Sequence, residues 1–132
     1  MFIFVDPTGE KLKMELWDQE KILSKSEWPL DHQLSQKFLD YLDEFLSTNT
    51  ITKENLKGLV VVRGPGSFTT LRVVISTLNV LAYALDIPIL GIEKGEKFSE
   101  KVVEKLIKAN NFKDPVAPYY KESPKITRSK KV

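Results

Sequence analysis

Hydrophobic and polar positions alternate near the start of the chain in the way that is typical of β-strands. Between Lys11 and Trp17, aliphatic side chains at every second position are separated by charged ones, which predicts a strand with one exposed face. A short apolar run precedes this segment at residues 2–5, and a less regular one follows at residues 21–28. Turn-forming residues separate the three segments, so we expect three antiparallel strands connected in a meander.

The centre of the chain is predicted to be a β–α–β unit. Residues 59–62 are all aliphatic, which is typical of a strand covered on both faces. An apolar pattern of helical period follows over residues 68–85, and Asp-Ile-Pro at 86–88 ends it, because a residue before proline avoids helical angles. A second apolar strand at residues 89–92 completes the unit, and two strands joined by a helical crossover are parallel.

The turn inside this unit is short and rich in glycine. Gly64, Pro65 and Gly66 form it, and Ser67 is suited to cap the following helix. Such a turn can also bind an anion through backbone N–H groups. However, no lysine follows as in a Walker loop, and Thr69 stands where a dinucleotide-binding fingerprint has its third glycine. We therefore prefer a structural turn to an anion site.

Two further segments have the apolar periodicity of helices. They cover residues 31–46, with Asp31 as the predicted N-cap, and residues 95–110. With the strands they predict one α/β domain over residues 1–114, followed by an irregular tail over residues 115–132. The predicted apolar stripes consist of Leu34, Phe38, Tyr41 and Phe45 in the earlier helix, and of Phe98, Val102, Leu106 and Ala109 in the later one.

Charge is unevenly distributed along the 132 residues. The formal net charge is +2, but residues 115–132 contain five basic residues and one acidic residue. The tail therefore carries +4, which leaves −2 for residues 1–114. A mildly acidic body argues against a strong field for nucleic acid, whereas the basic tail could contact phosphates.

Several classes of protein chemistry find no support in the composition. The chain has no cysteine, and His32 is its single histidine, so we expect no disulfide, no metal site, no cofactor and no catalysis by this chain alone. The apolar run at Met1–Asp6 is too short for a signal peptide, and no stretch reaches the roughly 20 apolar residues of a membrane span. We expect a cytoplasmic protein that does not contact membranes.

The motif GPGSFTTLR resembles the GPGSFTGLR signature of the TsaB family, bacterial accessory proteins in the synthesis of threonylcarbamoyladenosine in tRNA. Asp31-His32 opens a helix as in that family, and residues 86–92 are similar to its LP-x-x-GV segment. Residues 118–127 are similar to its C-terminal P-x-Y-L-R-x-P-x-x-T, although Lys121 and Glu122 stand where Leu and Arg are usual. The motif loop consists of Gly64, Pro65, Gly66, Ser67, Phe68, Thr69 and Arg72.

This resemblance implies a fold and a role. The fold would be a single lobe of the actin-like ATPase (ribonuclease H-like) class, a mixed five-stranded sheet with helices, without the second lobe of the family. Asp6-Pro7-Thr8-Gly9 lies where actin-like ATPases place their first phosphate loop, but Pro7 removes a backbone donor, so we expect a plain hairpin turn. The role would be a non-catalytic subunit that supports the catalytic subunit TsaD, with tRNA contacted only indirectly or through the basic tail.

The helix over residues 68–85 carries two apolar stripes on nearly opposite sides. The stripe formed by Leu71, Ile75, Leu78, Ala82 and Leu85 is expected to face the sheet. The helix over residues 31–46 could cover part of the other stripe, or another chain could. Because family members associate through these two helices, we expect a partner interface that consists of Leu39, Leu46, Val73, Thr77, Val80 and Ala84.

Two partners fit such an interface. One is a TsaD-like subunit, in a heterodimer. The other is a second copy of the chain, in a homodimer, and the alternative function is then a self-associating structural module that does not join the modification complex. Thr70, Val74, Leu78 and Val80 replace residues that are usually Gly, Gly, Ala and Gly in the family. Larger side chains hold helices further apart, which affects the expected geometry of association.

Overall fold

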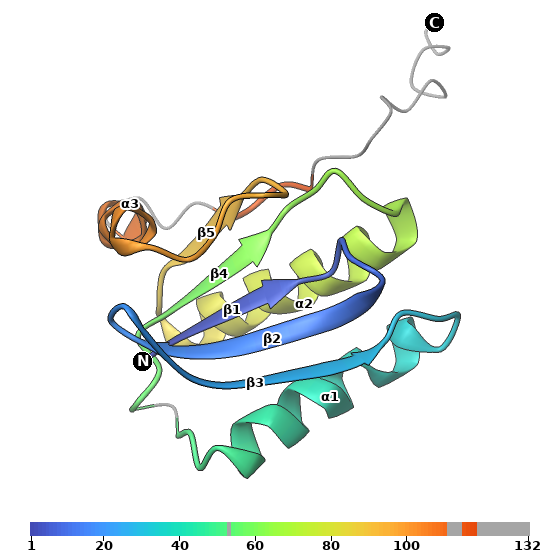
Figure 1. Cartoon of the computed structure of the whole chain (residues 1–132), viewed down its shortest axis with the longest axis horizontal. Helices are drawn as coiled ribbons and strands as arrows, with labels where there is room; N and C mark the ends of the chain where they lie inside the picture. Colours follow the sequence, from blue (N-terminus) through green and yellow to red (C-terminus); the bar gives the residue numbers. More distant parts are fainter. Residues whose placement is uncertain (53, 111–114, 119–132) are drawn as a thin grey trace, which may run out of the picture.

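A five-stranded mixed sheet in the order β3–β2–β1–β4–β5 forms the centre of the computed structural model, which describes residues 1–52, 54–110 and 115–118 (Figure 1). Every predicted strand and helix is present, so the predicted α/β fold is confirmed. In chain order the elements are β1 (Phe2–Asp6), β2 (Lys11–Asp18), β3 (Lys21–Pro29), α1 (Leu34–Thr48), β4 (Gly58–Val62), α2 (Phe68–Leu85), β5 (Ile89–Ile92) and α3 (Glu100–Asn110).

The antiparallel meander and the parallel β4–β5 pair are those that the sequence predicts, whereas the pairing of β1 with β4 joins them into one sheet and does not follow from the sequence pattern. β1 pairs with β2 and β2 with β3 in antiparallel orientation, as expected for a meander. β1 pairs with β4 in parallel, with Phe2 opposite Gly58, and β4 pairs with β5 in parallel, with Leu59 opposite Ile89. The carboxyl ends of β1, β4 and β5 therefore lie at the same edge of the sheet, where open α/β sheets place their sites.

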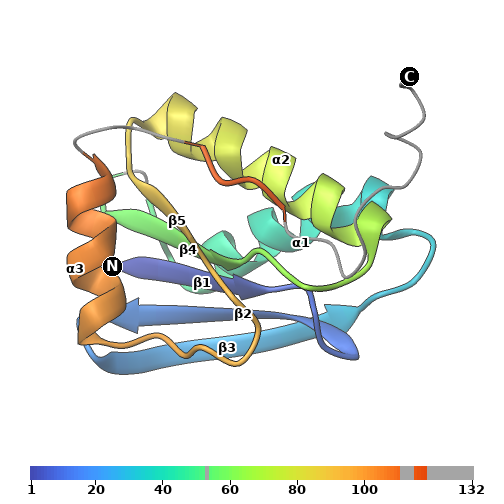
Figure 2. The same cartoon turned by 90° about the horizontal axis from the view of Figure 1, so that it is seen from above.

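Each face of the sheet has its own hydrophobic core. On one face, α1 and α2 pack over the inward side chains of β1 and β4, such as Ile3 and Leu59 (Figures 1 and 2). On the other face, α3 packs over the alternate side chains, and the rings of Trp17 and Phe98 stack with centroids 4.7 Å apart. This arrangement explains why β4, an interior strand between β1 and β5, is an unbroken apolar run with every residue buried.

The first helix begins later than the sequence predicts. α1 starts at Leu34 and its N-cap is Gln33, which makes no side-chain capping hydrogen bond. The predicted N-cap, Asp31, lies in a turn before the helix. Its carboxylate accepts a hydrogen bond from the backbone N–H of Gln33 at 2.9 Å. The prediction was wrong because a short acidic side chain can stabilise a local turn as readily as a helix start.

The last helix also begins later, at Glu100 instead of Gly95. Gly95 has a φ of 99°, which lies outside the helical region. The hydroxyl of Ser99 accepts from the N–H of Val102 at 3.4 Å, so this serine occupies the capping position. Phe98 lies in the segment before the helix and its side chain is buried. Val102 and Leu106 of the helix are buried as predicted. The side chain of Ala109 lies outside the described residues.

Helix α2 has the predicted limits. Ser67 is at the N-cap position with extended backbone angles, although its side chain makes no capping bond. Asp86 ends the helix in the left-handed conformation at φ 55°, and its N–H donates to the carbonyl of Tyr83. The N–H of Ile87 donates to the carbonyl of Ala82. Both bonds pair carbonyls that the end of a helix would otherwise leave without partners.

One detail of the α2 core face differs from the prediction. Leu71, Ile75, Leu78 and Ala82 are buried as expected, and Leu85 is half-buried. Val74, which the periodicity places at the edge of the opposite stripe, is fully buried, because it lies between Leu71 and Leu78 on the side where α1 packs. By length and composition α2 could also cross a membrane, with a mean hydropathy of 1.5. The fraction of this segment that is buried in the chain's own core is 28%.

Candidate functional site

Three loops meet at the carboxyl ends of the parallel strands. They are the turn after β1, the motif loop after β4 and the turn after β5. The backbone N–H of Lys94 donates to the carbonyl of Gly64 at 2.9 Å, and its Nζ donates to the carbonyl of Thr8 at 3.1 Å. A Cβ on Gly66 would lie 3.3 Å from Cγ2 of Thr8. The two bonds of Lys94 and the close approach of Gly66 to Thr8 thus join the three loops.

The turn after β1 has its polar groups engaged locally. Oδ1 of Asp6 accepts hydrogen bonds from the backbone N–H of Thr8 at 2.9 Å and from its hydroxyl at 2.6 Å. Pro7 is buried and has no N–H to donate. These bonds between Asp6 and Thr8 stabilise the turn locally.

The rest of the motif lies on the surface of α2. Phe68, Thr69 and Arg72 line one depression together with Val73, Thr77 and Ser76. The structure therefore brings part of the motif next to part of the predicted interface. Gly64, Pro65, Gly66 and Ser67 do not line this depression, and the Gly64–Pro65 peptide is cis.

The predicted interface residues lie on α1 and α2, and we call this set the outer face (Leu39, Leu46, Val73, Thr77, Val80 and Ala84). Val80 is 68% exposed and Leu39 is 65% exposed, and Ala84 is also exposed. Val73, Thr77 and Leu46 are half-buried. Leu46 lines a hollow with Leu81 and Leu85 between the two helices. Helix α1 therefore covers only the edge of the second stripe of α2, and the middle of that stripe is open to solvent.

The four positions that differ from the family's small residues fall into different environments. Val74 and Leu78 are fully buried and face the chain's own core. Thr70 is half-buried at the start of the helix, and Val80 alone of the four is exposed on the outer face. An effect on association through helix spacing thus concerns Val80 directly, whereas Val74 and Leu78 act through the packing of the lobe.

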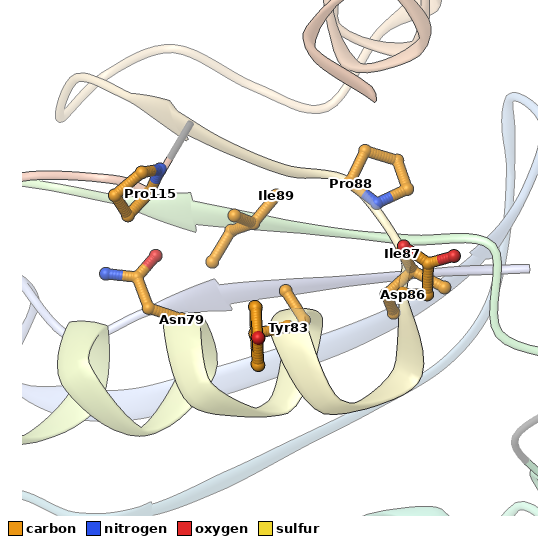
Figure 3. Close-up of a pocket in the computed structure, with 8 residues that line it drawn as sticks. Asn79, Tyr83, Asp86, Ile87, Pro88, Ile89 and Pro115 are labelled. Atoms are coloured by element: carbon orange, nitrogen blue, oxygen red, sulfur yellow. The ribbon is translucent and has the colours of Figure 1, made fainter. Parts of the chain in front are cut away.

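A second hollow, which the sequence does not reveal, lies at the C-terminal half of α2 (Figure 3). It has a volume of about 220 Å³, and Asn79 and Tyr83 line it from α2. Across from them lie Ile89 of β5 and Pro115. The polar Asn79 in an otherwise apolar stretch was the one signal that the sequence offered. Of the predicted tail, residues 119–132 lie outside the described residues, and they include residues 119–127 of the segment similar to the family's C-terminal motif.

His32 lies exposed in the turn before α1. Within residues 1–52, 54–110 and 115–118, no group of three or more His, Asp and Glu side chains is placed to hold a metal ion.

The fold defines the class of protein: a single lobe of the actin-like, ribonuclease H-like kind. RuvC of Thermus thermophilus superimposes with a TM-score of 0.51 at 12% identity, covering 89% of this chain and 84% of that one. YeaZ from Pseudomonas aeruginosa superimposes with a TM-score of 0.62 at 23% identity, covering 70% of this chain and 43% of that one. The predicted fold class is confirmed.

Sequence comparison identifies the family. The family model described as "TsaD: tRNA N6-adenosine threonylcarbamoyltransferase" matches residues 30–120. The chain belongs to this family, as a TsaB-like member. The tRNA threonylcarbamoyladenosine biosynthesis protein TsaB of Escherichia coli is 28% identical over 67% of this chain and 38% of its own length. The TsaB of Bacillus subtilis is 25% identical over 70% of this chain and 40% of its own length. The chain thus spans about two fifths of the length of these relatives.

Proposed function

We propose that this chain is a non-catalytic accessory subunit in the cytoplasmic synthesis of threonylcarbamoyladenosine in tRNA. In this role it binds a TsaD-like catalytic subunit through the outer face and supports that subunit's active arrangement. Two kinds of similarity support the proposal: the family model is named for the transferase, and the curated relatives are named for the same biosynthesis.

The observation that carries the proposal is the exposed apolar surface of the outer face. Val80 and Leu39 are each about two thirds exposed, and Ala84, one turn from Val80 on α2, is exposed as well. Large apolar side chains that gather on an exposed surface are costly for a monomer and commonly mark an association site. Ala84 and Thr77 are small enough to let a second helix approach closely, which suits packing into a helix bundle.

The non-catalytic part of the proposal rests on the loops at the sheet edge. Asp6, the carboxylate at the end of β1, already accepts two hydrogen bonds from Thr8. Lys94 donates to the backbone of both neighbouring loops. These groups stabilise the loops, and the proposal assigns no step of the chemistry to them.

Val80→Asp tests the interface. A carboxylate buried without a partner at a helix–helix contact weakens binding by at least about 100-fold, because its desolvation costs several kcal/mol. The fold should survive, since residue 80 is 68% exposed in the free chain. We expect an unchanged melting curve by circular dichroism and loss of the complex with the TsaD of the same organism in analytical ultracentrifugation.

Two variants act as controls. Ile107→Asp places the same charge at another exposed apolar position, 62% exposed on α3, and should leave both the fold and the complex intact. Leu78→Asp places it in the core and should unfold the chain. A Val80→Asp chain that binds TsaD as tightly as the wild type would contradict the proposal. Loss of a homodimer by Val80→Asp, in a chain that never binds TsaD, would support the self-associating module instead.

A further inference from the structure

The segment Pro115–Pro118 follows the last helix and lies between α2 and β5, on the face of the sheet that α2 covers (Figure 2). Asn79 of α2 holds it by the main chain. Its Nδ2 donates to the carbonyl of Val116 at 2.9 Å, and its Oδ1 accepts from the N–H of Val116 at 2.9 Å. A side-chain amide that pairs with both polar groups of one residue imitates a strand neighbour and recognises extended backbone whatever its side chain.

The surface of β5 is shaped for the side chain of this segment. A Cβ on Gly91 would lie 2.7 Å from Cγ1 of Val116 and 2.8 Å from Cδ of Arg63. Neither atom could stay in place with a larger residue at position 91. The missing side chain thus creates the space in which Val116 contacts the core beneath α2.

A third contact comes from the end of β4. Nε of Arg63 donates to the carbonyl of Ala117 at 3.1 Å. Successive residues of the segment are therefore held by α2, by β5 and by the residue after β4. Contacts from three separate elements converge on the segment, which is the layout of a binding groove more than of a loop that folds on itself.

The groove extends beyond the segment that fills it. The hollow of about 220 Å³ at the C-terminal half of α2 has Pro115 as one wall and Tyr83, Ile87 and Pro88 along its sides (Figure 3). Tyr83 is 90% exposed, so its ring stands at the rim. The lining is mainly apolar, and it continues along the line of the bound segment.

We propose that the groove between α2 and β5 is a binding site for an extended peptide, and that the chain's own Pro115–Pro118 occupies it as a docked strap. The ligand class is an extended peptide with a small branched residue and a small residue between two prolines. Proline suits both ends, because it favours extended backbone and brings no N–H that would need a partner. This site is separate from the outer face and does not depend on the proposed function.

Amide hydrogen exchange of Val116 in the full chain tests the proposal. Asn79→Ala removes both bonds to Val116, so its N–H should exchange about fivefold faster or more, the effect of losing a hydrogen bond of about 1 kcal/mol. The amide of Val61, in the interior strand β4, should be unchanged. Ser76→Ala, a similar truncation at an exposed position of α2, should leave Val116 at the wild-type rate.

A compensating pair tests the steric fit. Gly91→Ala should displace the strap and speed exchange at residue 116, because the new Cβ meets Val116. Val116→Ala in the same chain removes Cγ1 and should slow that exchange again. A structural loop without specific recognition would show no such rescue.

A titration with a free peptide tests whether the groove binds the sequence of the strap. In a Val116→Asp chain, whose strap no longer fits, the blocked tetrapeptide Pro-Val-Ala-Pro should cause a saturable shift of the Asn79 side-chain amide resonances. The shift should vanish when Asn79→Ala is added. Wild-type exchange at Val116 in the Asn79→Ala chain would overturn the proposal. Protection that grows with protein concentration would also overturn it, because the strap would then come from a second copy.

Discussion

At the scale of single residues, two glycines are required by what lies beside them. A Cβ on Gly58, at the start of β4, would lie 2.6 Å from Cδ2 of Leu106 and 3.2 Å from Cδ1 of Phe2. Leu106 is fully buried, so it has little room to move. Gly91 faces the docked strap in the same way. Both glycines let another side chain approach the sheet closely.

Gly58→Ala should therefore lower the free energy of unfolding by about 1–3 kcal/mol, the usual cost of forcing extra volume into a packed core. The measurement is urea denaturation of the purified chain. Gly9→Ala is the matched control, because its Cβ would meet nothing closer than 3.8 Å in an exposed turn. That variant should stay within about 0.5 kcal/mol of the wild type. Equal stability of both variants would show that α3 does not pack against β4 as described.

At the scale of elements, the turn of the β2–β3 hairpin holds one residue in an unfavourable backbone conformation. Gln19, in its turn, has a φ of 58°, which lies in the left-handed region that favours glycine. The φ of its neighbour Glu20 does not lie in that region. The register of the hairpin also shifts between Leu16 and Trp17. A tight turn of this kind needs a positive φ to match the twist of its strands.

Gln19→Gly should raise the free energy of unfolding by about 0.5 kcal/mol, because relief of the left-handed strain exceeds the added entropy of the unfolded chain. Glu20→Gly, one residue away, brings the same entropy without relieving strain and should lower the free energy by about 0.5–1 kcal/mol. Thermal unfolding followed by circular dichroism distinguishes the two. Destabilisation by both variants to the same extent would argue against a strained Gln19.

Helix α2 is the element on which most of the molecule depends. One side packs on the sheet, an edge packs on α1, Asn79 holds the strap, and the outer face is exposed. A helix with so many apolar sides is more apolar than a surface helix needs to be. The exposed part of that surface is what the proposed association would bury.

At the scale of the whole molecule, charge separates the body from the end of the chain. Residues 1–114 carry a net −2, and residues 115–132 carry +4. Cations in a short stretch can displace counterions from phosphates, so their contribution to tRNA binding would weaken steeply with salt.

Removal of the residues after Thr127 deletes Arg128, Lys130 and Lys131. If these residues contact phosphates, tRNA binding by the assembled complex should lose about 2–3 units from the slope of log K against log salt. The slope is measured by titrating labelled tRNA at several salt concentrations. An unchanged slope would mean that the three cations do not touch tRNA, and binding would then be indirect.

The sequence by itself determined the order and type of the elements, the antiparallel meander, the parallel pairing of β4 with β5, and the family. Strand alternation and helical periodicity are local signals, and a parallel β–α–β unit follows from them by a general rule. The motif from Gly64 to Arg72 is likewise a continuous string.

The tertiary structure alone decided the exact starts of two helices, the burial of one side chain and the contacts between distant segments. Asp31 and Gly95 did not start helices, because nearby backbone groups and a left-handed glycine favoured turns. The full burial of Val74 depends on α1 packing beside α2. The pairing of Asn79 with Val116 joins residues 37 positions apart, and no periodicity of either segment contains that contact. Packing between distant segments follows from three-dimensional fit, which a pattern along the chain does not encode.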